Sequence, residues 1–393
     1  MSASATSKLA LEGGDPVRST ILPYGRQTID ADDQAAVLEV LRSSYITRGP
    51  RVQAFEQALA DYCGVPYAVA FTSATAGLHA SMVLVGIKAL KRVLVPAITF
   101  TATANAVRYV EGEVVFGDLR SDTLNLNEKL LDTYGHLDAI VCVDYAGQAC
   151  AYDEFKSYCQ SKKIPLIADA AHSLGGSYKN KKVGSLADIN VLSFHPVKSI
   201  TSGEGGAVLV WNERDAKFLR QFRNHGNTPE IRPGYYEQEF LGFNYHFTEM
   251  QAALGGSQLK KLDSFVARRE EIAKSYNERL SRFDWLERPK VLAENKSAYH
   301  LYPIRLNLNR LSVDRDKFLE ALRAENVYAQ VHYIPVYWQP YYQQLGYSRG
   351  LCPVAEAEYA SELSLPIFPS MNEMDIEDVV RALDKLGSHF LKK

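Results

Sequence analysis

The chain has 393 residues, of which 46% are hydrophobic and 23% charged, and its formal net charge is −2. This composition is ordinary for a globular protein and excludes a disordered chain. A net charge so close to zero gives no electrostatic reason to expect nucleic acid as a partner. The length predicts more than one domain, and we expect an N-terminal segment over 1–28, a large domain over 29–262 and a small domain over 263–393.

The cysteines lack the paired spacing of metal ligands, so we expect neither a disulfide framework nor a metal site. They are Cys63, Cys142, Cys150, Cys159 and Cys352. The N-terminus has no basic region followed by a long apolar one, and nowhere do about 18 apolar residues follow one another. We therefore expect a cytoplasmic protein with no membrane partner.

The first part of the chain predicts a mobile lead followed by a helix. Small polar residues dominate residues 1–20. Asp30 is a suitable N-cap, and Ala36, Val37, Val40 and Leu41 form an apolar stripe behind it. The next segment, Tyr45, Ile46 and Thr47, has the pattern of a connecting loop.

From Ala68 the pattern changes to a strand followed by TSATAGLHASMVLVGI. Ser73 or Thr72 can cap this helix, and the free N–H groups of Thr75 and Ala76 would then form an anion site at its positive end. A capped helix without a ligand fits the same pattern.

Three further segments, VLVPAITFTATANAV, VVFGDL and AIVCVDYAGQA, predict strand endings that point to the same rim. Phe100 directly follows the first of them, where an aromatic ring is usually packing. Short apolar strands that alternate with helical segments predict an α/β protein with a mostly parallel sheet and right-handed crossovers.

Two later segments carry the candidate chemistry. In KIPLIADAAHSLGG an apolar strand ends on Asp169 and His172, at the strand end where open α/β sheets bind ligands. In VLSFHPVKSITSGEGGAVL a strand over 189–194 is followed by a turn that carries Lys198, and a second strand enters at Ala207. Lysines held this way form Schiff bases. A carboxylate and an amine so placed are what pyridoxal phosphate (PLP) needs for its ring nitrogen and its aldehyde.

The remaining chain predicts a smaller α+β part. A loop leads to a helix capped near Thr248, and a long helical stretch runs from Gln251 to about Phe283. HLYPIRLNL and AQVHYIPVY read as strands on either side of a helix over 314–325. A closing helix over 375–390 carries the stripe Val379, Val380, Leu383 and Leu386.

SFHPVKSITSGEGGAV and ADAAHSLGG resemble the sugar aminotransferases of the DegT-type family, which are fold type I PLP enzymes. The resemblance runs from about Leu11 to the last helix. Within the family it is greatest to the aminotransferases of pseudaminic acid biosynthesis, which act on a UDP-linked 4-keto-6-deoxy-N-acetylhexosamine. It implies a fold type I transferase with a smaller C-terminal α+β domain, and transamination from an amino-acid donor, glutamate by analogy, to a nucleotide sugar.

The resemblance also implies roles for single residues. Lys198 and Asp169 would be catalytic and bind the cofactor, with Phe100 and His172 beside its ring, and Thr75, Ala76 and Ser193 at its phosphate. Asn244 would reach the cofactor phosphate of a neighbouring subunit, which implies a homodimer with shared active sites. Substrate contacts would come from Tyr24, Tyr45, Ile46, Thr47, Gln330, His332 and Tyr333. His246 departs from the arginine of many relatives, which puts a salt bridge there in doubt.

Alternatives remain open at this point. Ser193 and Asn244 also fit as turn residues, and 330–333 fits as part of an aromatic-rich strand. The substrate could instead be another nucleotide-linked keto-sugar, namely a UDP-4-keto-pentose or a dTDP- or GDP-keto-hexose. The chain could also be a non-catalytic PLP-fold regulator. A nucleotide-binding α/β enzyme ranks last, since neither GxGxxG after a first strand nor GxxxxGK[ST] occurs.

Overall fold

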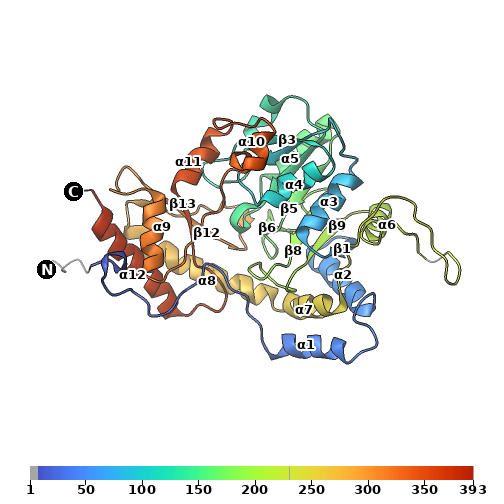
Figure 1. Ribbon diagram of the computed structural model, residues 1–393, viewed down its shortest axis with the longest axis horizontal. Coiled ribbons are helices and arrows are strands. Elements are labelled where there is room, and N and C mark those ends of the chain that lie inside the picture. The colour runs from blue at the N-terminus through green and yellow to red at the C-terminus, as the bar shows by residue number, and fades with distance from the viewer. Residues whose placement is uncertain (1–7, 230, 393) are drawn as a thin grey trace.

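The computed structural model describes residues 8–229 and 231–392. A seven-stranded sheet with the order β1-β9-β8-β5-β4-β2-β3 forms its centre (Figure 1). β9 is antiparallel to both of its neighbours, and the other pairs are parallel. The strands are β1 (Tyr67–Phe71), β2 (Arg92–Pro96), β3 (Glu113–Gly117), β4 (Ala139–Val143), β5 (Leu166–Asp169), β8 (Ile189–Ser193) and β9 (Gly206–Val210). The predicted α/β fold with a mostly parallel sheet is confirmed.

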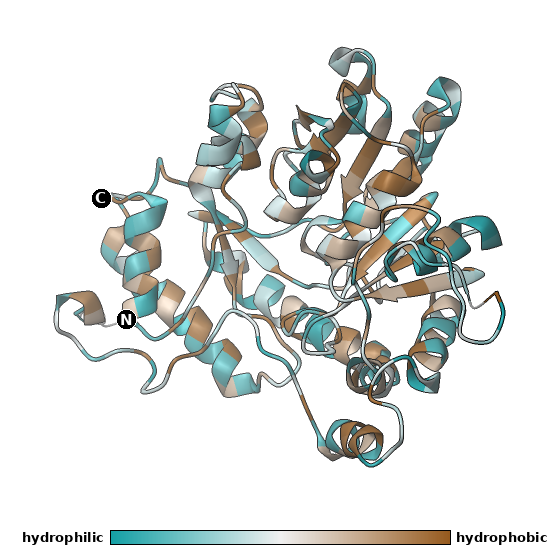
Figure 2. Ribbon diagram, turned by 45° about the vertical axis from the view of Figure 1, so that its right-hand side comes forward, coloured by the Kyte–Doolittle hydropathy of each residue, from teal (hydrophilic) through white to brown (hydrophobic). Residues whose placement is uncertain are grey.

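Helices cover both faces of this sheet because its strands are apolar on both sides. Successive residues alternate between two cores: Leu94 and Ile140 belong to one, and Val93 and Val141 to the other. Figure 2 shows hydrophobic residues gathered on the strands at the centre of the molecule. The first core includes side chains of α2 (Pro50–Cys63), α5 (Tyr152–Lys162) and α7 (Glu249–Leu259), and the second includes those of α3 (Ala74–Leu84), α4 (Thr101–Tyr109) and α6 (Glu213–Phe222).

The predicted helix caps agree with the structure. Asp30 caps α1 (Ala31–Leu41), Ser73 caps α3, and Thr248 forms a capping box with Gln251 at the start of α7. The stripe predicted for α1 is only partly buried, since Val40 is 2% exposed but Leu41 is 55% exposed. Only part of the helix circumference meets α7, against which α1 packs.

The C-terminal part contains an antiparallel sheet with the order β10-β12-β13. Its strands are β10 (Leu286–Glu287), β12 (Tyr302–Leu306) and β13 (Glu362–Leu365), and its helices are α8 (Leu262–Arg279), α9 (Arg315–Ala324), α10 (Pro340–Gln344), α11 (Pro353–Ser361) and α12 (Glu373–Phe390). A third core cluster joins α8, α9 and α12 to this sheet, and the predicted stripe of the closing helix is buried in it. The remaining short elements are β6 (Ser177–Tyr178), β7 (Lys181–Lys182), β11 (Asn295–Lys296), and the 3-10 turns η1 (Ala10–Glu12), η2 (Glu128–Tyr134), η3 (Tyr145–Gly147), η4 (Leu280–Arg282) and η5 (Val336–Trp338).

The predicted helical stretch from Gln251 to about Phe283 is present, with a break where α7 ends at Leu259 and α8 begins at Leu262. One prediction in this part is wrong. The segment around His332 is not a strand; it makes one isolated bridge, from Gln330 to Ser364. The backbone N–H of His332 donates to the side chain of Glu362, and its carbonyl accepts from the Tyr145 hydroxyl, so side chains replace a strand partner.

The start of the chain is docked rather than mobile from residue 8 onward. Residues 1–7, where the predicted lead begins, lie outside the described residues. Leu9 is 1% exposed, and the buried carboxylate of Glu325 accepts from the N–H groups of Ala10 and Val17, each at 2.9 Å. The prediction of a mobile lead is therefore wrong for 8–20.

The surface of the molecule carries an apolar projection. Residues 224–229 and 231–244 form an arm beyond α6 (Figure 1), and its apolar side chains Tyr235, Tyr236 and Leu241 are more than half exposed. All five cysteines, in contrast, are free and buried, as expected. No helix among the described residues combines the length and apolarity needed to cross a membrane.

Candidate active site

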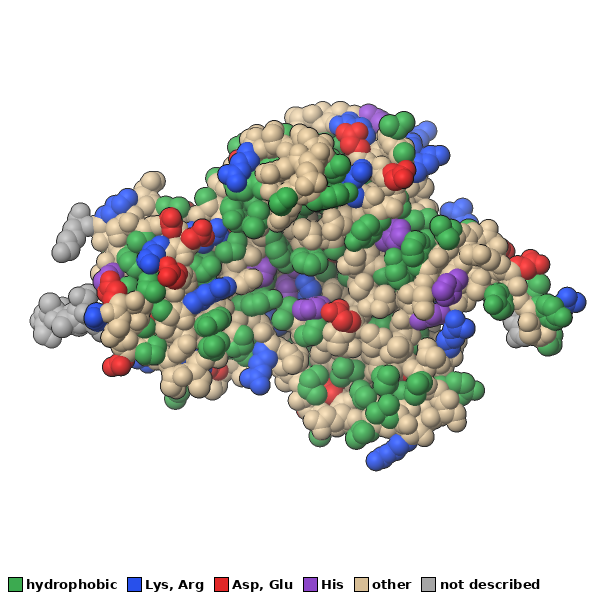
Figure 3. Space-filling model, viewed as in Figure 1, with side chains coloured by type: hydrophobic (Ala, Val, Ile, Leu, Met, Phe, Trp, Pro, Cys, Tyr) green, Lys and Arg blue, Asp and Glu red, His purple; other side chains and the backbone are tan. Residues whose placement is uncertain are grey.

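A cavity of about 600 Å³ lies at the carboxyl ends of the parallel strands. The ends of β4, β5 and β8 supply Val143, Asp169 and Ser193, and the first turn of α3 supplies Thr75. The opposite wall comes from the C-terminal part of the chain, including His300 and His332. Figure 3 shows histidine side chains gathered around a hollow between the two parts of the molecule, next to a basic side chain.

Lys198 reaches this cavity from the turn after β8, where its N–H donates to the carbonyl of His195 at 2.9 Å. Its Nζ lies 3.5 Å from Nε2 of His300. Burial lowers the pKa of Lys198 to about 8, and the negative charge of Asp169 opposes that shift. The neutral, nucleophilic fraction of the amine near neutral pH is therefore much larger than that of an ordinary lysine.

Asp169 is the last residue of β5, and its side chain is fixed from two sides. It accepts hydrogen bonds from Oγ1 of Thr103 at 2.7 Å and from the N–H of Ala171 at 3.2 Å. Burial raises the pKa of Asp169, while these hydrogen bonds and the charge of Lys198 lower it. An acid held in this way is suited to a cationic ring N–H, whose positive charge would stabilise the carboxylate.

Two imidazole rings form the side of the cavity next to these groups. The ring centroids of His172 and His300 are 4.3 Å apart, and Nε2 of His172 lies 3.3 Å from the hydroxyl of Tyr333. Burial, followed by the charge of Lys198, holds the pKa of both imidazoles well below the ordinary value. Nδ1 of each ring is buried without a hydrogen-bond partner, which is unusual away from a binding site.

Two of the three predicted phosphate residues, Thr75 and Ser193, line the same cavity. Thr75 lies in the first turn of α3, where N–H groups have no partner within the helix, and Ser193 lies at the end of β8. Ala76 differs from the expectation, since its N–H already donates to Oγ of Ser73 at 3.1 Å and the residue does not line the cavity.

Most of the predicted substrate residues also line this cavity. Tyr24, Gln330, His332 and Tyr333 do so. Phe100 lies at the cavity edge, 59% exposed, with its ring centroid 6.1 Å from that of Tyr333.

Besides Ala76, four predicted site residues do not line the cavity of their own chain. Tyr45 and Ile46 are more than half exposed, Thr47 forms a bridge with Thr248, and Asn244 forms a bridge with Asn224 at the base of the arm. His246 lies beside them, with Nε2 3.0 Å from the guanidinium of Arg48. Burial, and then the charge of Arg48, lowers the pKa of His246 to about 4.

The structure adds residues that the sequence analysis missed. His300 lies in a loop before β12 and has no motif around it. Thr103 stands on the first turn of α4, directly after a strand ending, so its position at the sheet rim could have indicated it. Glu362 and Ser364 lie behind His332 on β13 and look like ordinary strand residues in the sequence.

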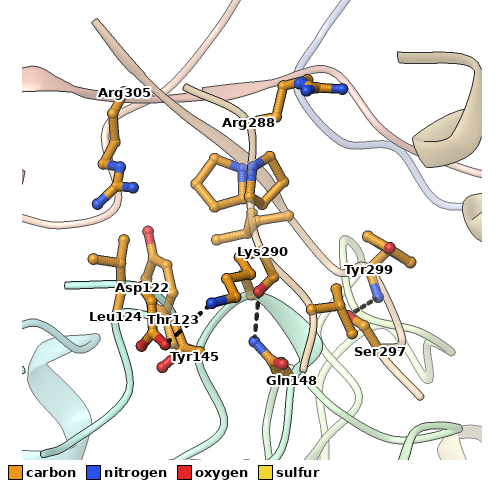
Figure 4. Close-up of a pocket in the computed structure, with 15 residues that line it drawn as sticks. Asp122, Thr123, Leu124, Tyr145, Gln148, Arg288, Lys290, Ser297, Tyr299 and Arg305 are labelled. Carbon is orange, nitrogen blue, oxygen red and sulfur yellow. Dashed lines mark hydrogen bonds and ion pairs between the residues drawn. The ribbon is translucent and has the colours of Figure 1, made fainter. Parts of the chain in front are cut away.

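A second cavity lies beneath η3 and beside the loop before β11 (Figure 4). It has about 30 Å³, room for about one water molecule. Its cationic side chains are already engaged: Lys290 lies 3.8 Å from Asp122, and Arg305 contacts Glu287 and Glu358. The larger cavity is therefore the candidate active site.

A parallel sheet whose rim presents a buried lysine, an acid and a helix N-terminus defines a PLP-dependent enzyme of the aminotransferase class. The model of the DegT/DnrJ/EryC1/StrS aminotransferase family matches residues 27–384, and the chain belongs to that family. Its members use PLP, so the cofactor and the family predicted from the sequence are confirmed.

Several relatives are similar over nearly their whole length. The UDP-4-amino-4,6-dideoxy-N-acetyl-beta-L-altrosamine transaminase of Campylobacter jejuni is 37% identical, covering 91% of this chain and 96% of its own. The uncharacterized protein MJ1066 of Methanocaldococcus jannaschii is 38% identical, with coverages of 95% and 99%.

Solved structures show the same architecture. Helicobacter pylori PseC, an aminotransferase involved in the biosynthesis of pseudaminic acid, has a TM-score of 0.90 and 33% identity, covering 94% of this chain and 100% of its own. The PLP form of the putative sugar aminotransferase Spr1654 from Streptococcus pneumoniae has a TM-score of 0.90 and 26% identity, with coverages of 95% and 100%.

Proposed function

We propose that this protein transfers an amino group from L-glutamate to the C4 keto group of a UDP-linked 4-keto-6-deoxy-N-acetylhexosamine. The observation that carries the proposal is the pair Lys198 and Asp169 facing one cavity, with an amine that is partly neutral at physiological pH. The names of the relatives from Campylobacter jejuni and Helicobacter pylori support the choice of sugar.

Each residue of the cavity has a proposed task. Bound PLP supplies an electron sink for the carbon that loses a proton. Asp169, held by Thr103, would keep the proton on the ring nitrogen, and Nζ of Lys198 would accept the proton of the donor carbon and deliver it to the aldehyde carbon of the cofactor. His172 packs beside the ring. Thr75 in the first turn of α3 and Ser193 hold the phosphate, together with the positive end of the helix.

The proposed active form is a homodimer in which each subunit completes the site of the other. Asn244 and the 45–47 loop are exposed and lie outside the cavity of their own chain, which supports contacts with a second copy. Many relatives carry an arginine at the position of His246. Here the guanidinium of Arg48 lies beside His246, so Arg48 would supply the missing positive charge. The exposed apolar residues of the arm fit such an interface.

The domain limits and the location are part of the same proposal. The third core cluster, which is built mainly from residues after Leu262, supports a small domain over 263–393 and a large domain over 29–262. Leu9 and Leu22 pack in that cluster, so residues 8–28 would belong to the small domain in space. We place the enzyme in the cytoplasm, where nucleotide sugars are made.

The test is amination of defined sugars with ¹⁵N-labelled L-glutamate, followed by mass spectrometry. We expect the label in the product of the UDP-4-keto-6-deoxy-N-acetylhexosamine, and none with the Lys198→Ala variant. UDP-4-keto-pentose and dTDP- and GDP-keto-hexoses are run in parallel, and preference for one of them would replace the proposed sugar. PLP binding without amination of any sugar would contradict an enzymatic role and favour the regulator.

A further inference from the structure

Three buried polar side chains form a line that ends at the cavity wall. Glu362 and Ser364 are two residues apart on β13 and so lie on the same face of the strand, and both are almost fully buried. His332, which is 6% exposed, lies between them and the cavity. Oγ of Ser364 is 2.6 Å from Oε1 of Glu362, and Nδ1 of His332 is 2.9 Å from the same Oγ.

The second carboxyl oxygen of Glu362 is also engaged, since it accepts from the backbone N–H of His332 at 3.0 Å. A serine hydroxyl carries one proton, so Ser364 can donate to only one of its two neighbours. The position of the other protons therefore depends on the charge of Glu362.

When Glu362 is ionised, Ser364 donates to it and accepts from Nδ1–H of His332. A neutral imidazole with a proton on Nδ1 has a lone pair on Nε2. When Glu362 carries a proton on Oε1, the direction of both hydrogen bonds reverses. Ser364 then donates to Nδ1, and the proton of His332 is on Nε2.

Nε2 is the ring nitrogen of His332 that remains for the cavity, because Ser364 occupies Nδ1. The contact of Nδ1 with Ser364 orients the ring, which packs with its centroid 5.2 Å from that of Tyr24, and the hydroxyl of Tyr145 holds the backbone by donating to the carbonyl of His332. The line thus connects a buried carboxyl group to one defined point on the cavity wall.

We propose that Glu362 is a positioning residue that acts through Ser364 to determine whether His332 donates a hydrogen bond to the substrate or accepts one. With Glu362 protonated, Nε2–H can also deliver its proton to a substrate oxygen. The N–H bond breaks as the O–H bond forms, Nδ1 takes the proton of Ser364, and Ser364 takes the proton of Glu362. Glu362 is left as a carboxylate, and His332 stays neutral.

The environment of Glu362 brings the gain or loss of its proton close to physiological pH. Burial raises the pKa of Glu362 to about 8, so the carboxyl group is mainly protonated below that pH and ionised above it. Burial, and then the charge of Lys198, lowers the pKa of His332 to about 3, so the imidazole itself is neutral throughout. The other titratable or charged groups that act on Glu362 or His332 are Arg315, Glu358, Tyr145, Tyr333, His172 and His300.

The test is the tautomer of His332 in the holoenzyme, read by long-range ¹H–¹⁵N NMR of protein labelled with ¹⁵N-histidine. The His332→Asn variant identifies the signal. We expect wild-type His332 to change from Nε2–H to Nδ1–H as the pH rises through about 8. In Glu362→Gln the amide donates to Ser364 at every pH, so the change is lost and Nε2–H persists.

Two further variants test the link between Glu362 and the tautomer of His332 even if Glu362→Gln does not fold. Ser364→Ala interrupts the line, and the tautomer is expected to lose its dependence on Glu362. Glu358→Gln removes a nearby carboxyl group that does not touch Ser364, and the change should survive. A wild-type tautomer that does not respond to pH, or a response that persists in Ser364→Ala, would overturn the proposal.

The inference rests on the proposed function only for the identity of the substrate. Failure to aminate any sugar would remove that function but leave the tautomer result intact. In the active enzyme, the KM of the Glu362→Gln variant should no longer change as the pH rises into the alkaline range. If Glu362 had a merely structural role, its replacement would lower activity equally at all pH values.

Discussion

Burial determines what Lys198 can do. A solvated lysine is almost fully protonated near neutral pH, whereas burial lowers the pKa of Lys198 to about 8. The same cavity walls that bury Lys198 also hold neutral imidazoles, so no second cation competes for Asp169 there among the described residues.

The rate at which apoenzyme takes up PLP should therefore rise with pH up to about 8 and level off above it. Below the pKa the neutral, reactive fraction of the amine grows about tenfold per pH unit. The measurement is stopped-flow absorbance after mixing apoenzyme with PLP. Lys198→Ala, the control, should show no such change. A rate that keeps rising to the ordinary lysine pKa would contradict the assignment.

Individual residues show which parts of the site could be predicted from the sequence and which could not. Asp169 and Ser193 end strands and Lys198 follows one, and every parallel strand ends at the same rim, so their proximity could be expected from the pattern. The packing of the C-terminal part against the large sheet brings His300 to the cavity and places Glu362 and Ser364 behind His332. That packing has no local signature, and these residues were missed.

Among the elements, α2 has an unusual start. Its N-cap, Gly49, offers no side-chain hydrogen bond, and the carboxylate of Glu249 from α7 accepts instead from the N–H groups of Arg51 and Val52, at 2.7 and 3.1 Å. Glu249 is 1% exposed. One helix thus supplies the cap of another and fixes the two relative to each other.

Replacement of Glu249 by Ala should destabilise the protein by about 1–3 kcal/mol, because two N–H groups of α2 lose a charged acceptor. Glu249→Gln keeps an acceptor and should cost less. Urea denaturation followed by circular dichroism measures both. Glu271→Ala, at an exposed site on α8, is the matched control and should change stability by no more than about 0.5 kcal/mol. Equal losses for Glu249→Ala and the control would contradict this capping role.

Element boundaries were predictable where a cap or an apolar run marked them, as with Ser73, Thr248 and the strand before Lys198. The break between α7 and α8 could not be predicted, because Lys260 and Lys261 continue a helical pattern in the sequence. In the structure, Lys261 forms ion pairs with Asp30 and Asp33, which lie far away in the chain. The segment around His332 has strand composition, but side chains satisfy its backbone instead of a neighbouring strand.

At the scale of the whole molecule, Lys198 lines the cavity and Asn244 does not, which makes the proposed dimer testable. Lys198→Ala and Asn244→Ala variants, each impaired alone, are mixed and allowed to exchange subunits. If Asn244 serves the partner's cavity, half of the pairs are mixed and each contains one intact site, so activity should recover to about a quarter of the wild-type value.

The same experiment distinguishes a dimer in which Asn244 serves the partner's cavity from one in which Asn244 serves its own. If Asn244 served its own cavity, every site in a mixed pair would lack one residue and no activity would return.

The exposed apolar side chains of the arm give a second test of the dimer. Leu241→Asp should increase the fraction of monomer measured by analytical ultracentrifugation, because it puts a charge into the proposed interface. Leu90→Asp, at an exposed leucine outside the arm, should leave the fraction of monomer unchanged.

The burial of every cysteine has a practical consequence for studying that assembly. Burial raises the pKa of Cys63 to about 12 and those of the other four thiols as well, so the native thiols will react slowly with maleimide dyes. A cysteine introduced in place of Leu90, which is exposed and lies outside the arm, would then carry a fluorophore almost alone. Energy transfer between two such labels could track subunit association in real time without first stripping the natural sulfhydryl groups from the chain.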